Sequence, residues 1–230
     1  MARSTPLALS LAALTALAPL AAAQVQLTSA SAETRVESPS TAVYAGLYAT
    51  DGGMVEVRSA RGHLVVVAHG AEVAAALAPL STPDAATDAR AEVLLDAWTL
   101  DEMETVVAAV RPARRAQAAA SFAAYRAALV RGRGPAVAGS VIGTFDQTDG
   151  RSATLVQMLF ERGPEWASFV WDEDGALVTI ARGLSPVVLG TARPSGDDHF
   201  EAADVPLAFE READGRVRAL RVGDRFSAVR

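Results

Sequence analysis

The sequence lacks three residue types altogether: its 230 residues include no cysteine, no lysine and no asparagine. Without cysteine the chain cannot form a disulfide bond, even in the oxidising compartments where such bonds persist, so its fold must be held by packing. The missing thiol and the missing lysine amine also exclude thiol catalysis, Schiff-base chemistry and a Ser-Lys catalytic pair. Apart from histidine, every basic side chain is an arginine.

The N-terminus has the organisation of a secretory signal peptide. Arg3 gives a short basic start, an apolar run rich in alanine and leucine covers residues 6–20, and residues 21–23 are the small alanines that signal peptidase recognises. We therefore expect residues 1–23 to be removed and the protein to be exported, to the periplasm or outside the cell. The alternative is an uncleaved membrane anchor. That needs ~20 strongly apolar residues, and this run is shorter and interrupted by polar residues and a proline.

The mature chain is acidic. The full sequence has a formal net charge of −6, and the mature chain has about −7, because the positive charge of Arg3 is lost with the signal. A net negative surface repels phosphate backbones, which argues against nucleic-acid binding. No later apolar run is long enough to span a bilayer, so we expect no transmembrane span after cleavage. Residues 24–41 are rich in serine, threonine and alanine and show no apolar periodicity, which predicts a flexible tether.

Beyond the tether, the hydrophobic period changes twice along the chain. Period-two patterns and turn residues predict strands at 44–48, 54–57, 63–68, 72–77, 137–145, 152–161, 166–172, 176–181, 187–192, 205–211, 216–222 and 225–229. Helical spacing between the two strand groups predicts helices at 89–98, 99–110 and 112–131, the second with a capping box beginning at Thr99. Asp-Gly turns at 149–150, 174–175 and 214–215 predict antiparallel hairpins. The fold class is therefore α+β, rich in antiparallel strands, with helices on one side of the sheets.

Both ends of this region carry a family resemblance. Residues 44–48 (YAGLY) and 62–64 (GHL), with 198–200 (DHF), 206–211 (PLAFER) and 214–217 (DGRV), resemble the lipocalin-like β-barrel appended to many beta-lactamase-like serine hydrolases. Residues 89–182 are similar to the cystatin-like or NTF2-like module, in which helices pack on a curved meander.

The resemblance implies a split barrel that accommodates an inserted module. Residues 42–80 and 183–230 would be the two barrel halves, and residues 81–182 the helix-on-meander module. The hydrolase domain is absent, and its Ser-x-x-Lys motif cannot exist without lysine. The resemblance therefore implies an accessory or ligand-binding part without its enzyme.

Several polar groups in the sequence are candidate chemical sites. His63 and His69 would share one face of a strand, but about 20 Å of extended chain separates them, too far for one zinc ion. Residues 197–199 (DDH) fit a solvated turn better than a metal site, and residues 172–175 (DEDG) lack the alternating ligands of a calcium loop. We therefore expect no metal and no cofactor.

A serine nucleophile also lacks sequence support. A Ser-His-Asp triad is allowed by composition, but no Gly-x-Ser-x-Gly elbow occurs. Ser140 and Ser185 are the serines with small or rigid neighbours, and neither has the strand-turn-helix pattern of a nucleophile. We assign no catalytic residue.

An aromatic group is the remaining candidate site. Phe122 and Tyr125 fall on one face of the last helix and would meet a sheet carrying Met158, Phe160, Phe169 and Trp171. In a helix-on-sheet fold such residues either line a ligand pocket or form an ordinary packed core. If they line a pocket, Tyr125 is a candidate proton donor.

Three functions follow from these patterns. The first is a non-catalytic exported protein that binds an envelope protein or a small apolar ligand. The second is an NTF2-like enzyme with a pocket, acting on an unknown small molecule. The third is a structural spacer for a partner hydrolase.

Overall fold

The computed structural model describes residues 40–224 and 226–230. The expected signal peptide lies outside the described residues, as does the expected tether except for its last two residues. Thr41, the last of these, is buried and hydrogen-bonds through its hydroxyl to Ser59. In the part of the chain that is described, no helix combines the length and the apolar character needed to cross a membrane.

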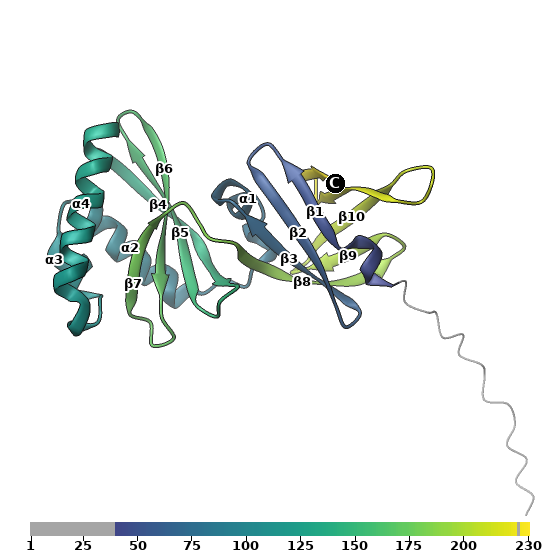
Figure 1. Ribbon diagram of the computed structural model, residues 1–230, viewed down its shortest axis with the longest axis horizontal. Helices are drawn as coiled ribbons and strands as arrows, with labels where there is room; N and C mark the ends of the chain where they lie inside the picture. Colours follow the sequence, from purple (N-terminus) through teal and green to yellow (C-terminus); the bar gives the residue numbers. More distant parts are fainter. Residues whose placement is uncertain (1–39, 225) are drawn as a thin grey trace, which may run out of the picture. The chain divides into compact units, whose positions relative to one another are not determined.

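Strands dominate the described chain, and most of the helices fall in one stretch between two groups of strands (Figure 1). In chain order the elements are η1 (Thr41–Tyr44), β1 (Gly46–Thr50), β2 (Gly53–Ala60), β3 (His63–His69), α1 (Ala71–Ala76), η2 (Ala78–Leu80), α2 (Ala85–Thr99), α3 (Met103–Ala108), η3 (Pro112–Arg114), α4 (Arg115–Arg133), β4 (Ala136–Gln147), β5 (Ser152–Phe160), β6 (Gly163–Trp171), β7 (Leu177–Arg182), β8 (Val187–Gly196), β9 (His199–Ala202), β10 (Val205–Arg211), β11 (Val217–Val222) and β12 (Phe226–Val229). The expected α+β, strand-rich class is confirmed.

Eight of the strands form a closed antiparallel barrel. Their order is β3-β2-β1-β12-β11-β10-β9-β8, and β8 pairs back onto β3 to close the ring. The barrel strands therefore come from two separate stretches of sequence, on either side of the helices and the β4–β7 meander. The β2–β3 hairpin turns through Arg61 and Gly62, both with positive φ, which is the geometry of a tight hairpin that follows the strand twist.

Aromatic rings occupy the interior of the barrel. Tyr44, Tyr48, Phe200 and Phe209 are each at most 5% exposed. The ring of Phe209 lies 4.8 Å from that of Tyr44, 5.6 Å from that of Phe200 and 5.9 Å from that of Tyr48, centroid to centroid. These spacings are those of favourable tilted and edge-to-face pairs, so the barrel interior is filled with side chains at this level.

A second hydrophobic cluster lies between the helices and the meander of β4, β5, β6 and β7. Figure 1 shows α2, α3 and α4 gathered on one side of these strands. Trp98 of α2 is fully buried there, with its ring 6.5 Å from that of Phe122 on α4. The i, i+3 and i+7 spacing of Phe122, Tyr125 and Leu129 predicts their shared face, and all three contribute to this cluster.

Two local predictions were wrong. The strand expected at 72–77 is the helix α1, because Gly70, with φ 116°, ends β3 and the alanine-rich segment after it has high helix propensity. The capping box at Thr99 does not form. Thr99 is the last residue of α2, its hydroxyl donates to the Leu95 carbonyl at 2.8 Å, and α3 begins only at Met103.

A core substitution measures how much the filled barrel depends on its rings. We expect Phe200→Ala to lower the free energy of unfolding by about 3–5 kcal/mol, because it leaves a cavity among Tyr44 and Phe209. Leu47→Ala is the control, since Leu47 is 51% exposed on the outside of β1, and should change stability by less than about 0.5 kcal/mol. Urea unfolding compares the two. Equal losses would contradict the packed interior.

Candidate functional site

The six residues expected to line a pocket lie together in the second hydrophobic cluster. Phe122, Met158, Phe160, Phe169 and Trp171 are at most 3% exposed, and Tyr125 packs partly buried against them. They form one contiguous group, as the sequence predicted. Whether they bind a ligand stays a prediction.

The hydroxyl of Tyr125 and the indole nitrogen of Trp98 are buried polar atoms of this cluster without a hydrogen-bond partner among the described residues, and the hydroxyl is the one that can transfer a proton. Burial, together with the negative charge of Glu165, raises the pKa of Tyr125 to about 12, while the positive charges of Arg182 and Arg133 act in the opposite direction. A phenol with so high a pKa keeps its proton at neutral pH.

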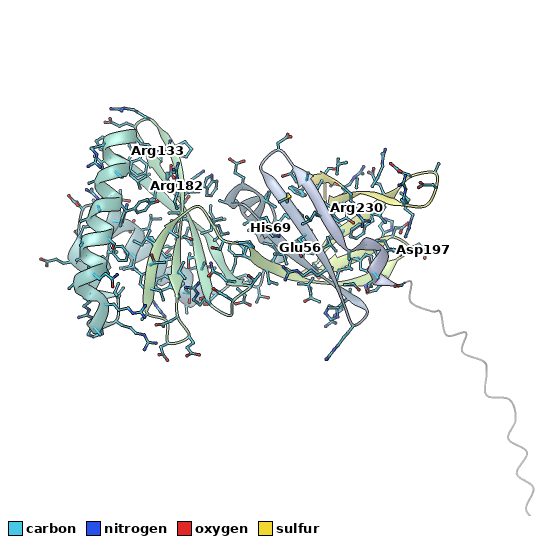
Figure 2. The ribbon with its side chains drawn as sticks, in the orientation of Figure 1. Glu56, His69, Arg133, Arg182, Asp197 and Arg230 are labelled. Atoms are coloured by element: carbon cyan, nitrogen blue, oxygen red, sulfur yellow. The ribbon has the colours of Figure 1, made fainter. Side chains whose placement is uncertain are left out.

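Glu165 is a buried carboxylate whose negative charge acts on that hydroxyl. Its side chain is 4% exposed and accepts from Arg182 Nε at 2.6 Å, and its other oxygen lies 2.7 Å from Arg133 Nη2. Figure 2 shows the two arginines close together. Two charge-assisted contacts compensate the desolvation of the carboxylate. All three residues line an open pocket of about 510 Å³, but Tyr125 does not.

The two histidines of β3 lie at opposite ends of the strand. His63 and His69 are the first and last residues of β3. His69 Nε2 lies 2.9 Å from Glu56 Oε2, and Arg58 Nε donates to Glu56 Oε1 at 2.8 Å. The hydrogen bond from Arg58, followed by that with His69, lowers the pKa of Glu56 to about 2. Sequence reasoning missed this trio, although the register of the β2–β3 hairpin would have placed Glu56 diagonally across from His69.

The DDH segment is a turn, as expected, but its middle residue has a further role. Asp198, with φ 55°, accepts from the Tyr44 hydroxyl at 2.8 Å and lies 2.6 Å from Arg211 Nη2. Arg211 also stacks over the Tyr44 ring, 5.4 Å from its centroid. The hydrogen bond from Arg211 is the main cause that lowers the pKa of Asp198. These contacts join η1, which precedes β1, to the β8–β9 turn and to the end of β10.

The DEDG segment is the β6–β7 hairpin turn. Asp172 Oδ1 accepts from the backbone N–H groups of Asp174 and Ala176, and both Asp172 and Asp174 bind Arg111. Across the described ranges, no group of three or more histidine or acidic side chains is placed to hold a metal ion. Ser140 and Ser185 are exposed, and neither is hydrogen-bonded to a histidine within the described chain.

A further charged feature was not predicted. A surface pocket of about 630 Å³ opens at the end of the barrel where the β10–β11 hairpin meets η1 and the chain beyond β12. We call it the arginine groove; its lining residues are Val43, Arg211, Glu212, Gly215, Arg216, Val217, Arg218 and Arg230. Three of the four arginines belong to the β10–β11 hairpin. Arg230 follows β12, and its backbone N–H donates to the Arg218 carbonyl beside the β11–β12 pair.

Comparison with known proteins does not bear on these sites. No family model, curated protein or solved structure matches the chain. Function therefore has to be argued from the geometry alone.

Two tyrosine variants test whether the Tyr125 hydroxyl is unpaired. Tyr125→Phe should leave the free energy of unfolding within about 0.5 kcal/mol of the wild type or raise it, because removing an unsatisfied buried group carries no loss. Tyr48→Phe is the matched control: its buried hydroxyl donates to the Tyr44 carbonyl at 2.6 Å, so its loss should cost about 1–2 kcal/mol. Both are measured by urea unfolding. A comparable loss for Tyr125→Phe would mean that a ligand or water binds there.

Proposed function

We propose that this chain is an exported, non-catalytic accessory protein of the cell envelope, which binds its partner or ligand on its outer surface. The observation that carries the proposal is the filled interior. Rings of Tyr44, Tyr48, Phe200 and Phe209 occupy the barrel, and the second cluster is equally buried. A binding protein with a filled interior must use surface grooves, and the two pockets described above are of that kind.

Composition and side-chain geometry support a non-catalytic role. Cysteine and lysine are missing from the whole sequence. In the described part of the chain, His69 bonds Glu56 and His199 bonds the carbonyl of Asp197, so neither activates a serine. A serine nucleophile is commonly activated by such a pairing with a histidine base.

The closed eight-stranded barrel supports the accessory role. We propose that it corresponds to the lipocalin-like barrel that accompanies beta-lactamase-like hydrolases, with the helices and the β4–β7 meander as the cystatin-like or NTF2-like part. A spacer for a partner hydrolase is a special case of this role, in which the protein partner is the enzyme itself.

One observation favours a second candidate function. The unpartnered Tyr125 hydroxyl lies near the buried Glu165 carboxylate, and a tyrosine beside an acid can transfer protons. For this enzyme to work, substrate would have to reach a hydroxyl that is buried, so the pocket beside Glu165 would need to open toward α4. The filled cluster makes surface binding the better supported function.

The proposed function predicts both processing and a partner. The protein, produced at native level in an exporting bacterium, should appear in the periplasm or the medium with Gln24 as its first residue, as read by mass spectrometry of the intact chain. Affinity capture of that species should recover a protein partner or a small ligand in a fixed ratio. Ala23→Arg is the control, because it removes the small residue before the cleavage site and should leave the signal attached.

Two outcomes would count against the proposal. An intact N-terminus in the cytoplasm would remove the export claim. A correctly exported protein that recovers neither a partner nor a ligand would remove the binding claim.

A further inference from the structure

The arginine groove concentrates positive charge on an acidic protein. The whole chain has a formal net charge of −6, yet the side chains that line the groove include four arginines and a single acidic residue, Glu212. Three of these arginines have acidic partners: Arg211 pairs with Asp198, Arg216 with Asp214 and Glu212, and Arg218 with Glu210. Among the described residues the fourth, Arg230, has none.

Arg230 carries a positive charge that only neutral groups hold in place. Its Nη2 donates to the Ala45 carbonyl at 2.9 Å and its Nη1 to the Val43 carbonyl at 3.3 Å. Within the described residues no acidic side chain lies at ion-pair distance from it; the ion pairs of the groove belong to its three neighbours. Figure 2 labels Arg230 on the barrel. The guanidinium is fixed in position while its charge remains available to a ligand.

A glycine leaves room for this arrangement. A Cβ added at Gly46 would lie 2.8 Å from Arg230 Nε and 3.1 Å from the guanidinium carbon. The guanidinium therefore lies against the backbone of β1, in space that any other residue at position 46 would fill. Replacing this glycine would move the charge without removing it.

The neighbouring arginines still have donors to offer. Arg218 bonds Glu210 through Nη2 alone, and Glu210 is also bound by Arg221. Arg216 uses Nε and Nη2 for its acidic partners. Because a guanidinium has five N–H donors, each retains donors that its protein partners do not use. Arginines ordered in advance by such contacts lose less entropy when they bind a ligand.

We propose that the arginine groove binds a small molecule that carries phosphate or carboxylate groups. Guanidinium groups match both oxyanions in planar, charge-assisted hydrogen bonds, and a volume of about 630 Å³ is that of small-molecule sites. Val43, 45% exposed at its edge, gives the ligand a small apolar contact. The proposal rests on the proposed binding function and replaces the apolar ligand expected from the sequence with an anionic one.

Isothermal titration calorimetry with two small probes tests the groove. Pyrophosphate and citrate present phosphate and carboxylate chemistry, and the protein is the exported chain without a C-terminal tag, since Arg230 lies in the site. We expect at least one probe to bind in low salt, and Arg230→Gln to weaken the dissociation constant about tenfold or more. Gly46→Ala should weaken it as well, and added salt should reduce binding to the wild type.

Two further variants keep the test decisive. Arg216→Gln combined with Arg218→Gln leaves Arg230 and the Tyr44–Asp198–Arg211 contacts intact, so it should fold normally, which thermal unfolding checks, and still bind more weakly. Arg193→Gln is the matched control: it removes the same charge from an exposed position on β8 outside the groove and should leave the dissociation constant within about twofold of the wild type.

Three results would overturn the proposal: no heat with either probe, equal weakening by Arg193→Gln, or binding only to vesicles containing phosphatidylglycerol, which would make the ligand a membrane surface. The proposed function would survive any of these results if the groove variants still captured a partner.

The opposite result separates the two proposals in the other direction. If the exported protein binds a probe but captures no partner, the accessory role is wrong and the anion site stands.

Discussion

The structure depends on β8, the strand that pairs with three others: β3, β4 and β9. On one edge Val187 and Val188 pair with Ala68 and Val67 of β3, which closes the barrel. On the other edge the same two residues pair with Gln147 and Asp146 of β4, and further along β8 pairs with β9. Because backbone groups on both edges are satisfied there, the barrel and the meander belong to one continuous sheet.

Closing the sheet in this way decides where chemistry can occur. The inward faces of the strands and helices carry buried apolar side chains that pack against one another, as the aromatic rings of the barrel and the cluster around Trp98 show. Polar groups are left at the ends of strands and in turns, where segments distant in sequence meet. The Tyr44–Asp198–Arg211 contacts and the arginine groove both form at such an end. Recognition from the outside is thus a consequence of how the interior is filled.

The sequence predicted the parts of this fold that local physics determines. Period-two patterns and Asp-Gly turns located most strands, and the Phe122 face of α4 followed from helical spacing. It missed two sets of side-chain contacts: that Asp198 would bind Tyr44 and Arg211, and that Arg218 and Arg230, neighbours across the β11–β12 pair, would line one pocket. It was wrong at 72–77, where apolar alanines fit a short strand and a helix equally well and Gly70 decided between them.

The two hydrophobic clusters are coupled through β8, and buried methyl groups report on that coupling directly. Val66 of β3 is buried in the barrel cluster, and Met158 is buried in the second cluster. In a urea titration of methyl-labelled protein followed by NMR, the native signals of both should vanish at the same midpoint, as for one cooperative unit. Two separated midpoints would show that the clusters unfold independently and would contradict the shared strand as the constraint that holds the fold together.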